Sequence, residues 1–258
     1  MRAILKRELR AYFSSPVGYV CIAALVALYG LNYTNLMLTG STAYVSQVYS
    51  SMFMYSMMII PIITMRSMSE DRKNKTDQAL LTAPIGVTSI VLGKFLACFG
   101  VYFIACTIGI APAFVMASFS NPPWAIIFGN YIATLLYGSA MIAIGVFISS
   151  LTESQVISAI GSFIVAMLLL FMDGIASSIG GIIGEVISWI SFTSRYNVFS
   201  IGIFSISSTC FFLSVTAVFI FLTARKLESR RWNWWRRIKW KVFLILINSS
   251  TAQWHLFL

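Results

Sequence analysis

The chain has 258 residues, of which 59% are hydrophobic and 10% are charged, and its mean hydropathy is +0.85. These values exclude an ordinary soluble domain, in which about a quarter of the residues are charged. The net charge of +10 does not indicate nucleic-acid binding, because the basic residues adjoin long apolar stretches and no recognition motif accompanies them. We therefore predict an integral membrane protein.

Six apolar stretches are long enough to cross a bilayer, since a membrane-spanning helix needs about 20 predominantly apolar residues. They cover residues 17–38, 48–65, 95–117, 125–148, 155–172 and 203–224. The sequence therefore predicts an all-α membrane protein with six transmembrane helices.

The basic residues predict the orientation of these spans. All but one of the 18 Lys and Arg residues fall within residues 2–10, 66–94 and 225–241, and the exception is Arg195. By the positive-inside rule, the three clusters are cytoplasmic. An even number of spans places both termini on that side, so we predict a multi-pass protein of the plasma membrane with cytoplasmic termini.

The first segment of the chain has the pattern of an amphipathic helix. Arg2, Lys6 and Arg10 recur every four residues on one face, and Leu5 and Leu9 lie on another. We expect this helix to lie along the inner surface of the membrane.

The cytoplasmic stretch 66–94 combines a dense charge cluster with a short apolar group. Glu70 and Asp71 favour a helix N-terminus through the helix dipole, whereas Leu80 and Leu81 would be exposed unless a partner covered them. We predict a short docking helix for a cytoplasmic partner. The alternative is a solvated loop between two spans.

The segment 173–202, before the last span, is the longest connection on the outer side. It is largely apolar, is interrupted by four glycines, and holds a short helical pattern at 185–190. We predict re-entrant helices buried against the protein, because backbone that breaks its helix at membrane depth must be covered by protein or line a cavity. An ordinary surface loop is the alternative.

The sequence offers no group of residues for catalysis or metal binding. The four cysteines are spaced like neither a disulfide framework nor a metal site, and the only histidine is His255. Residues 11–65 and 95–152 contain no Asp, Glu, Lys, Arg or His, so they offer no titrating side chain for proton coupling. If the protein transports a substrate, energy must enter through residues 66–94.

Several separated segments resemble ABC-2 type transporter permeases, in particular the branch of gliding-motility and copper-enzyme-maturation permeases. The segments are KRELRAYFSSPVGYV (6–20), MRSMSEDRKNKTDQALLTAPIG (65–86), IVLGKFLA (90–97), FISSLTESQVISA (147–159) and SFTSRYNVFSIGI (191–203). They occur in the same order as in the family. The resemblance covers residues 1–232 and implies one transmembrane domain there.

The resemblance implies a permease subunit that is not itself an enzyme and holds no cofactor. Such permeases pair with a second copy or a homologous permease. They are driven by two copies of an ABC ATPase, which binds ATP and Mg. The ATPase docks on the interfacial N-terminal helix and on a coupling helix between spans two and three. The coupling residues here would be Glu70, Asp71, Arg72, Thr76, Leu80 and Pro84, and the interfacial helix would present Lys6, Arg7, Glu8 and Arg10. Many relatives have Gly where this chain has Lys75.

The resemblance also implies a pathway and a gate. Spans two and five face the dimer axis in this family, which implies a pathway near Met54, Met57, Met58, Gly161, Phe163 and Met167. A Met-rich apolar wall suits export of a hydrophobic or amphipathic substrate, although ordinary helix packing is the alternative for each residue. The gate would be the segment 173–202, with Glu185 and Arg195.

The tail departs from the family pattern. Trp and basic residues alternate from 230 to 241, as in an interfacial belt on anionic lipids, and residues 242–258 would reach only about 25 Å as a helix. We predict that the segment 233–258 lies at the membrane interface and is not a seventh span.

Two other functions stay open from the residues alone: a non-transporting membrane scaffold or assembly subunit, and an ion-coupled secondary carrier.

Overall fold

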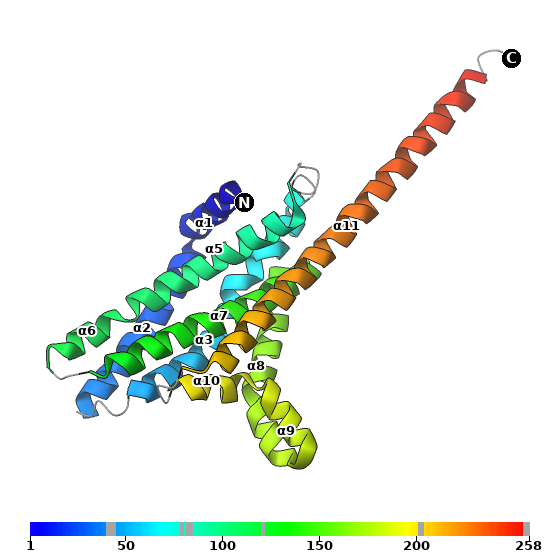
Figure 1. Cartoon of the computed structure of the whole chain (residues 1–258). Helices are drawn as coiled ribbons and strands as arrows, with labels where there is room; N and C mark the ends of the chain where they lie inside the picture. Colours follow the sequence, from blue (N-terminus) through cyan, green and yellow to red (C-terminus); the bar gives the residue numbers. More distant parts are fainter. Residues whose placement is uncertain (40–44, 78–79, 81–84, 120–121, 201–203, 255–258) are drawn as a thin grey trace.

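The computed structural model describes residues 1–39, 45–77, 80, 85–119, 122–200 and 204–254, and, apart from residues 39 and 200, their side chains through Trp232. Over these ranges the regular secondary structure is helical (Figure 1). The helices are α1 (Arg2–Ser14), α2 (Pro16–Thr39), α3 (Val45–Lys73), α5 (Val87–Ile108), α6 (Ala111–Ala117), α7 (Trp124–Leu151), α8 (Gln155–Ile179), α9 (Gly181–Ile190), α10 (Phe192–Ser200) and α11 (Ile206–Trp254).

Six segments of the described chain are long and apolar enough to cross a membrane, which confirms the predicted all-α fold with six spans. They are Pro16–Leu38, Val45–Lys73, Val87–Ala117, Trp124–Leu151, Gln155–Ile179 and Ile206–Trp232. The third span is interrupted between α5 and α6, where Pro112 removes a backbone donor from the first turn of α6.

Among the helices that extend further than the sequence predicted are α3 and α5. α3 continues to Lys73, so Glu70 and Asp71 lie in its last turns, and the prediction that they begin a helix was wrong. α5 begins at Val87, eight residues before the predicted start, so Lys94 lies inside a helix. Both helices cross the predicted boundaries because their charged side chains find partners on other helices, as described below.

The helix α7 lies at the centre of the bundle, where it contacts α3, α5, α8, α10 and α11. Two of its glycines let neighbouring helices approach closely. A Cβ atom on Gly138 would lie 2.1 Å from Cε1 of Tyr102, and one on Gly145 would lie 2.3 Å from Oγ1 of Thr64. Small residues at such crossings are the usual means of packing helices within a membrane.

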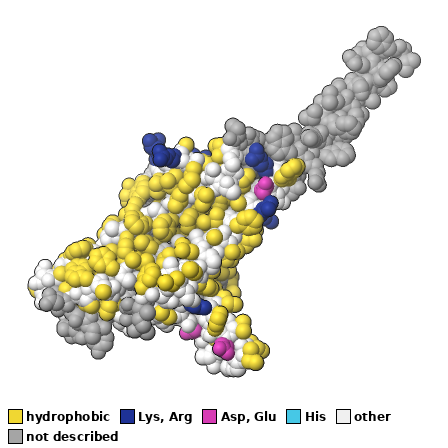
Figure 2. Space-filling model, viewed as in Figure 1, with side chains coloured by type: hydrophobic (Ala, Val, Ile, Leu, Met, Phe, Trp, Pro, Cys, Tyr) yellow, Lys and Arg dark blue, Asp and Glu magenta, His cyan; other side chains and the backbone are white. Residues whose placement is uncertain are grey.

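The bundle has two chemically different ends. The basic end comprises the start of α1, the end of α3, the start of α5, the end of α7 and residues 225–231 of α11. Figure 2 shows most of the visible Lys and Arg side chains at that end, with a hydrophobic surface extending toward the opposite end. That opposite end carries α6, α9 and α10, and α9 projects away from the bundle (Figure 1).

The segment before the last span folds into two short helices, α9 and α10, and α8 extends through Asp173 to Ile179. α10 buries Phe192, Tyr196 and Phe199 in the core of the bundle, so it is not an exposed loop. α9 is largely exposed, with Gly184 its one buried residue, so the prediction that this segment is buried against the protein was wrong for α9. The depth of both helices in the membrane stays a prediction, as does the interfacial placement of 233–258. The helix α11 runs without a break to Trp254.

Candidate functional site

The helices α1, α3 and α5 meet at a group of charges at the basic end, three of them largely buried and one half-exposed. We call Arg7, Glu8, Asp71 and Lys94 the Lys94 cluster. The ammonium of Lys94 lies 2.6 Å from Oδ2 of Asp71 and 3.1 Å from Oε1 of Glu8. Arg7 lies 2.6 Å from the same oxygen of Glu8 and 3.4 Å from Oδ2 of Asp71. Two cations therefore face two carboxylates, which compensates the charge of Lys94, a side chain only 3% exposed.

Close packing of α1 on α5 brings Glu8 to Lys94. A Cβ atom on Gly93 would lie 2.9 Å from Cγ2 of Ile4, so only glycine lets α1 approach this closely. Further along α1, the hydroxyl of Tyr12 donates a hydrogen bond of 2.7 Å to the carbonyl of Ile63 in α3. Burial raises the pKa of Tyr12 well above its usual range, so the phenol keeps the proton that it donates.

Arg66 ties α3 to the junction between α1 and α2. Its Nε lies 2.8 Å from Oε2 of Glu70, and its guanidinium also donates to the hydroxyl of Ser15. The same guanidinium lies 5.5 Å from the ring centroid of Tyr12, within the range of a cation–π contact. The predicted coupling residue Glu70 therefore positions a cation that contacts two other elements.

On its other side, α3 is bonded to the end of α7. Arg72 lies 2.9 Å from Oε1 of Glu153 and donates to the carbonyl of Ser150 at 3.3 Å. The hydroxyl of Ser149 accepts hydrogen bonds from the backbone N–H groups of residues 68 and 69, and donates to the carbonyl of residue 65, each at 3.1 Å. The last turns of α3 are thus joined to α1, α5 and α7 together.

The chain turns directly after α3. Lys75 has a φ of +57°, in the left-handed region that favours glycine, and this is the position at which many of the permeases that the chain resembles have Gly. The hydroxyl of Thr76 then donates to Oδ1 of Asp71 at 2.7 Å, which holds the turn against the Lys94 cluster. Leu80 lines a pocket beside α3, and Pro84 lies outside the described residues.

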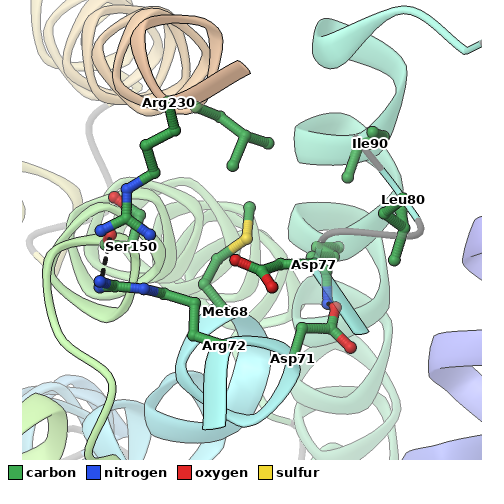
Figure 3. A pocket seen from close by; sticks show the side chains of 10 residues that line it. Met68, Asp71, Arg72, Asp77, Leu80, Ile90, Ser150 and Arg230 are labelled. Atoms are coloured by element: carbon green, nitrogen blue, oxygen red, sulfur yellow. Dashed lines mark hydrogen bonds and ion pairs between the residues drawn. The ribbon is translucent and has the colours of Figure 1, made fainter. Parts of the chain in front are cut away.

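This pocket lies between the end of α3, the start of α5, the end of α7 and α11 (Figure 3). Its walls are partly apolar, with Met68, Leu80, Ile90 and Leu227, and partly charged. The charged lining residues are Asp71, Arg72, Asp77, Lys94 and Arg230. Three of the predicted coupling residues therefore line the pocket, namely Asp71, Arg72 and Leu80.

The residues predicted for the pathway differ in how exposed their side chains are. Met57 is fully buried in the core of this single chain, whereas Met54 and Met58 are 48% and 42% exposed. On α8, Phe163 is exposed, and Gly161 and Met167 are half-buried. α3 and α8 pack against each other, so the exposed members of the set lie on neighbouring helices.

At the opposite end, Arg195 holds the predicted gate together. Its Nε donates to the carbonyl of Trp189 at 3.3 Å, and NH1 donates to the hydroxyl of Ser207 at 3.0 Å. The next residue, Tyr196, bonds to Oγ1 of Thr134 at 3.0 Å and donates to the carbonyl of Tyr49 at 3.2 Å. Glu185 lies on the exposed helix α9. Arg195 thus links α9 to α11, and Tyr196 links α10 to α7 and α3.

Sequence reasoning missed Lys94, Arg66 and Ser149 as parts of the site. A usable signal existed only for Lys94. It is an isolated cation seven residues into an apolar stretch that begins at Val87, and an isolated charge in such a stretch needs a partner. The roles of Arg66 and Ser149 depend on contacts between distant segments, which spacing in the sequence does not reveal.

The remaining residues of the interfacial helix, Lys6 and Arg10, are exposed on α1, away from the Lys94 cluster. Their exposure leaves them available to a partner or to lipid.

Comparison with known proteins identifies the family. No curated protein matches the chain. The family model described as "ABC-2 family transporter protein" matches residues 20–226, which include most of all six spans. This chain therefore belongs to the ABC-2 transporter family and is a multi-pass membrane permease subunit.

Proposed function

We propose that this permease couples ATP hydrolysis, carried out by a separate ATPase subunit that binds ATP and Mg, to export of a hydrophobic or amphipathic substrate across the plasma membrane. The basic end faces the cytoplasm in this proposal, because Lys and Arg concentrate on that side of membrane proteins. Membership of the ABC-2 family supports the pairing with an ATPase. The finer placement among gliding-motility and copper-enzyme-maturation permeases stays a prediction from the resemblance.

The observation that carries this proposal is the way the end of α3 is bonded to the rest of the bundle. A partner that pushes on residues 70–80 acts directly on the Lys94 cluster, on Arg66 and on Arg72. These contacts join α3 to α1, α5 and α7, so the push moves several helices together. Rigid-body movement of packed elements is a common way to transmit such a signal.

The transport pathway in this proposal forms between two copies of the chain. Met54, Met58 and Phe163 are exposed apolar side chains on the adjacent helices α3 and α8. Two such surfaces that face each other make an apolar passage suited to a lipid-like substrate or a hydrophobic peptide.

The proposal is tested by purifying the permease with its ATPase and measuring ATP hydrolysis in proteoliposomes. The substitution Glu70→Lys places a second cation beside Arg66 and reverses one charge on the docking surface. We expect hydrolysis coupled to the permease to fall by at least about tenfold, because like-charge contacts at an interface cost several kcal/mol. Leu80→Asp, which removes an apolar contact from the same surface, should have a similar effect.

The matched control is Glu228→Lys. Glu228 also pairs with an arginine, Arg225, three residues away at the basic end, but it lies on α11, outside the coupling segment. Unaltered hydrolysis in both Glu70→Lys and Leu80→Asp would reject the docking assignment. Transport by the permease alone, without nucleotide, would favour a secondary carrier, and an ATPase complex that moves no substrate would favour a scaffold.

A further inference from the structure

The pocket beside α3 presents an unusual pair of cations. Figure 3 shows the guanidinium groups of Arg72, from α3, and Arg230, from α11, pointing toward one another beside Ser150. Two like charges at close range repel each other, and the repulsion is stronger in a partly buried site than in water. Glu153 and Asp77 offset part of this repulsion, and a further anion between the two groups would offset the rest.

The described residues accept few hydrogen bonds from this pair. An arginine offers five N–H donors. Arg72 donates to Glu153 and Ser150, whereas Arg230 forms no hydrogen bond or ion pair with any described residue. Asp77 and Glu153 attract Arg230 electrostatically without forming an ion pair with it. The pair therefore has donors to spare for an additional acceptor.

The carboxylates in the pocket wall do not supply that acceptor. Asp71 is already bound by Lys94, Arg7 and Thr76. Asp77 is engaged in an interaction of its own. The described carboxylates of the pocket wall thus leave donors of Arg72 and Arg230 for a further acceptor beside Ser150.

The remaining walls are apolar and lie close to the edge of the membrane. Met68, Leu80, Ile90 and Leu227 line the same pocket. Arg230 is six residues beyond Ala224, where the apolar part of α11 gives way to basic residues, and six residues of helix span about 9 Å. The pocket therefore lies near the headgroup layer and combines donors for an anion with a surface for hydrocarbon.

We propose that this pocket binds an anionic phospholipid, with its phosphate between Arg72 and Arg230 and its glycerol and upper acyl carbons against Leu80, Ile90 and Leu227. Arginine forks match phosphate oxygens in a bidentate manner, and basic pockets between transmembrane helices are known sites for anionic headgroups. The bound lipid bridges Leu80, which follows α3, and Leu227 on α11.

The test needs neither an ATPase nor transport, so its outcome is independent of the proposed function. The purified full-length chain is placed in nanodiscs of phosphatidylcholine alone or with phosphatidylglycerol. Native mass spectrometry then measures bound phosphatidylglycerol, and thermal unfolding measures stabilisation. We expect phosphatidylglycerol to stay bound and to raise the unfolding temperature. In Arg230→Gln its affinity should fall about tenfold, as loss of a charge-assisted contact predicts.

Arg225→Gln is the matched control, because Arg225 lies on the same helix, pairs with Glu228 and is 67% exposed. Wild-type binding by Arg230→Gln, or an equal loss in Arg225→Gln, would overturn the proposal in favour of general attraction to the basic end. If Arg230→Gln does not fold, Arg230→Lys keeps the charge without the fork, and we expect weaker binding than in the wild type. Full wild-type affinity in Arg230→Lys would also overturn the proposal.

A second arm identifies the source of the phosphate. Glycerol 3-phosphate and inorganic phosphate are added to the protein in phosphatidylcholine nanodiscs at matched ionic strength. Neither should reproduce the stabilisation, because neither fills the apolar half of the pocket. Equal stabilisation by either compound would show that the site takes a soluble phosphate and would refute a lipid occupant.

Discussion

The two ends of the bundle are each organised around one buried polar side chain, but by different forces. At the basic end, Lys94 is 3% exposed and meets two carboxylates and the carbonyl of Ser67. At the opposite end, Tyr196 is 1% exposed and meets one hydroxyl and one carbonyl. Ionic contacts in a buried site are stronger than neutral hydrogen bonds. From this comparison we predict that the basic end moves as one body, whereas α9 and α10 separate from the bundle more easily.

The largest expected effect tests the ion pairs of Lys94 at the basic end. Lys94→Met removes the cation that Glu8 and Asp71 share, and both carboxylates stay partly buried. We expect a loss of about 3–5 kcal/mol in the free energy of unfolding, as for other broken buried ion pairs. Chemical unfolding in detergent micelles, followed by tryptophan fluorescence, measures it.

The control for Lys94→Met is Arg225→Met, which breaks an exposed ion pair on α11 and should cost less than about 1 kcal/mol. Equal losses in the two variants would show that the Lys94 cluster contributes no more than a surface pair.

A smaller effect is expected at the opposite end. Tyr196→Phe removes a hydroxyl and leaves the carbonyl of Tyr49 without that donor, which should cost about 1–3 kcal/mol. Hydrogen exchange should rise over α10 before it rises over α3 and α7. Ile182→Ala on α9, at a side chain 83% exposed, should change stability by no more than about 0.5 kcal/mol. Uniform exchange along the whole chain in Tyr196→Phe would contradict a loosely held α10.

The smallest expected effect concerns the left-handed backbone of Lys75 at the basic end. Lys75→Gly should stabilise the protein by about 1 kcal/mol, because glycine adopts the left-handed backbone without the steric cost that Lys75 bears. Lys73→Gly, two residues earlier and at the last residue of α3, should destabilise it by less than about 1 kcal/mol, since glycine weakens a helix most in its interior. The two unfolding midpoints should therefore shift in opposite directions, and a shift in the same direction would refute strain at Lys75.

Much of the fold was predictable, because apolar length alone indicates a membrane span. All six spans and the short helices before the last one follow from that pattern and from the glycines around residue 180. The helix ends did not follow from it. Lys94 looks like a boundary until Glu8 and Asp71 are known to surround it, and Glu70 and Asp71 suggest a helix start when only the local dipole is considered.

The position of the candidate site could be predicted from the sequence, but the contacts between its side chains could not. The dense charges at 66–77 mark the segment, whereas the partners of Arg66 and Arg72 lie 51 and 81 residues away along the chain. Such pairings depend on how α1 and α7 pack against α3, and that packing depends on small residues such as Gly93 and Gly145 whose neighbours the sequence does not reveal.

In the described chain, α3 differs from the other spans because its backbone N–H groups donate hydrogen bonds to a side chain of another span, the hydroxyl of Ser149. This hydroxyl accepts hydrogen bonds from two backbone N–H groups of α3 and donates one to a carbonyl one turn away. About two turns earlier, α3 already lacks one backbone N–H group, because Pro61 has none. In a medium without water, a helix that changes its winding must keep its peptide groups occupied. Ser149 supplies such partners from outside the helix, so we predict that α3 bends where its polar turns begin.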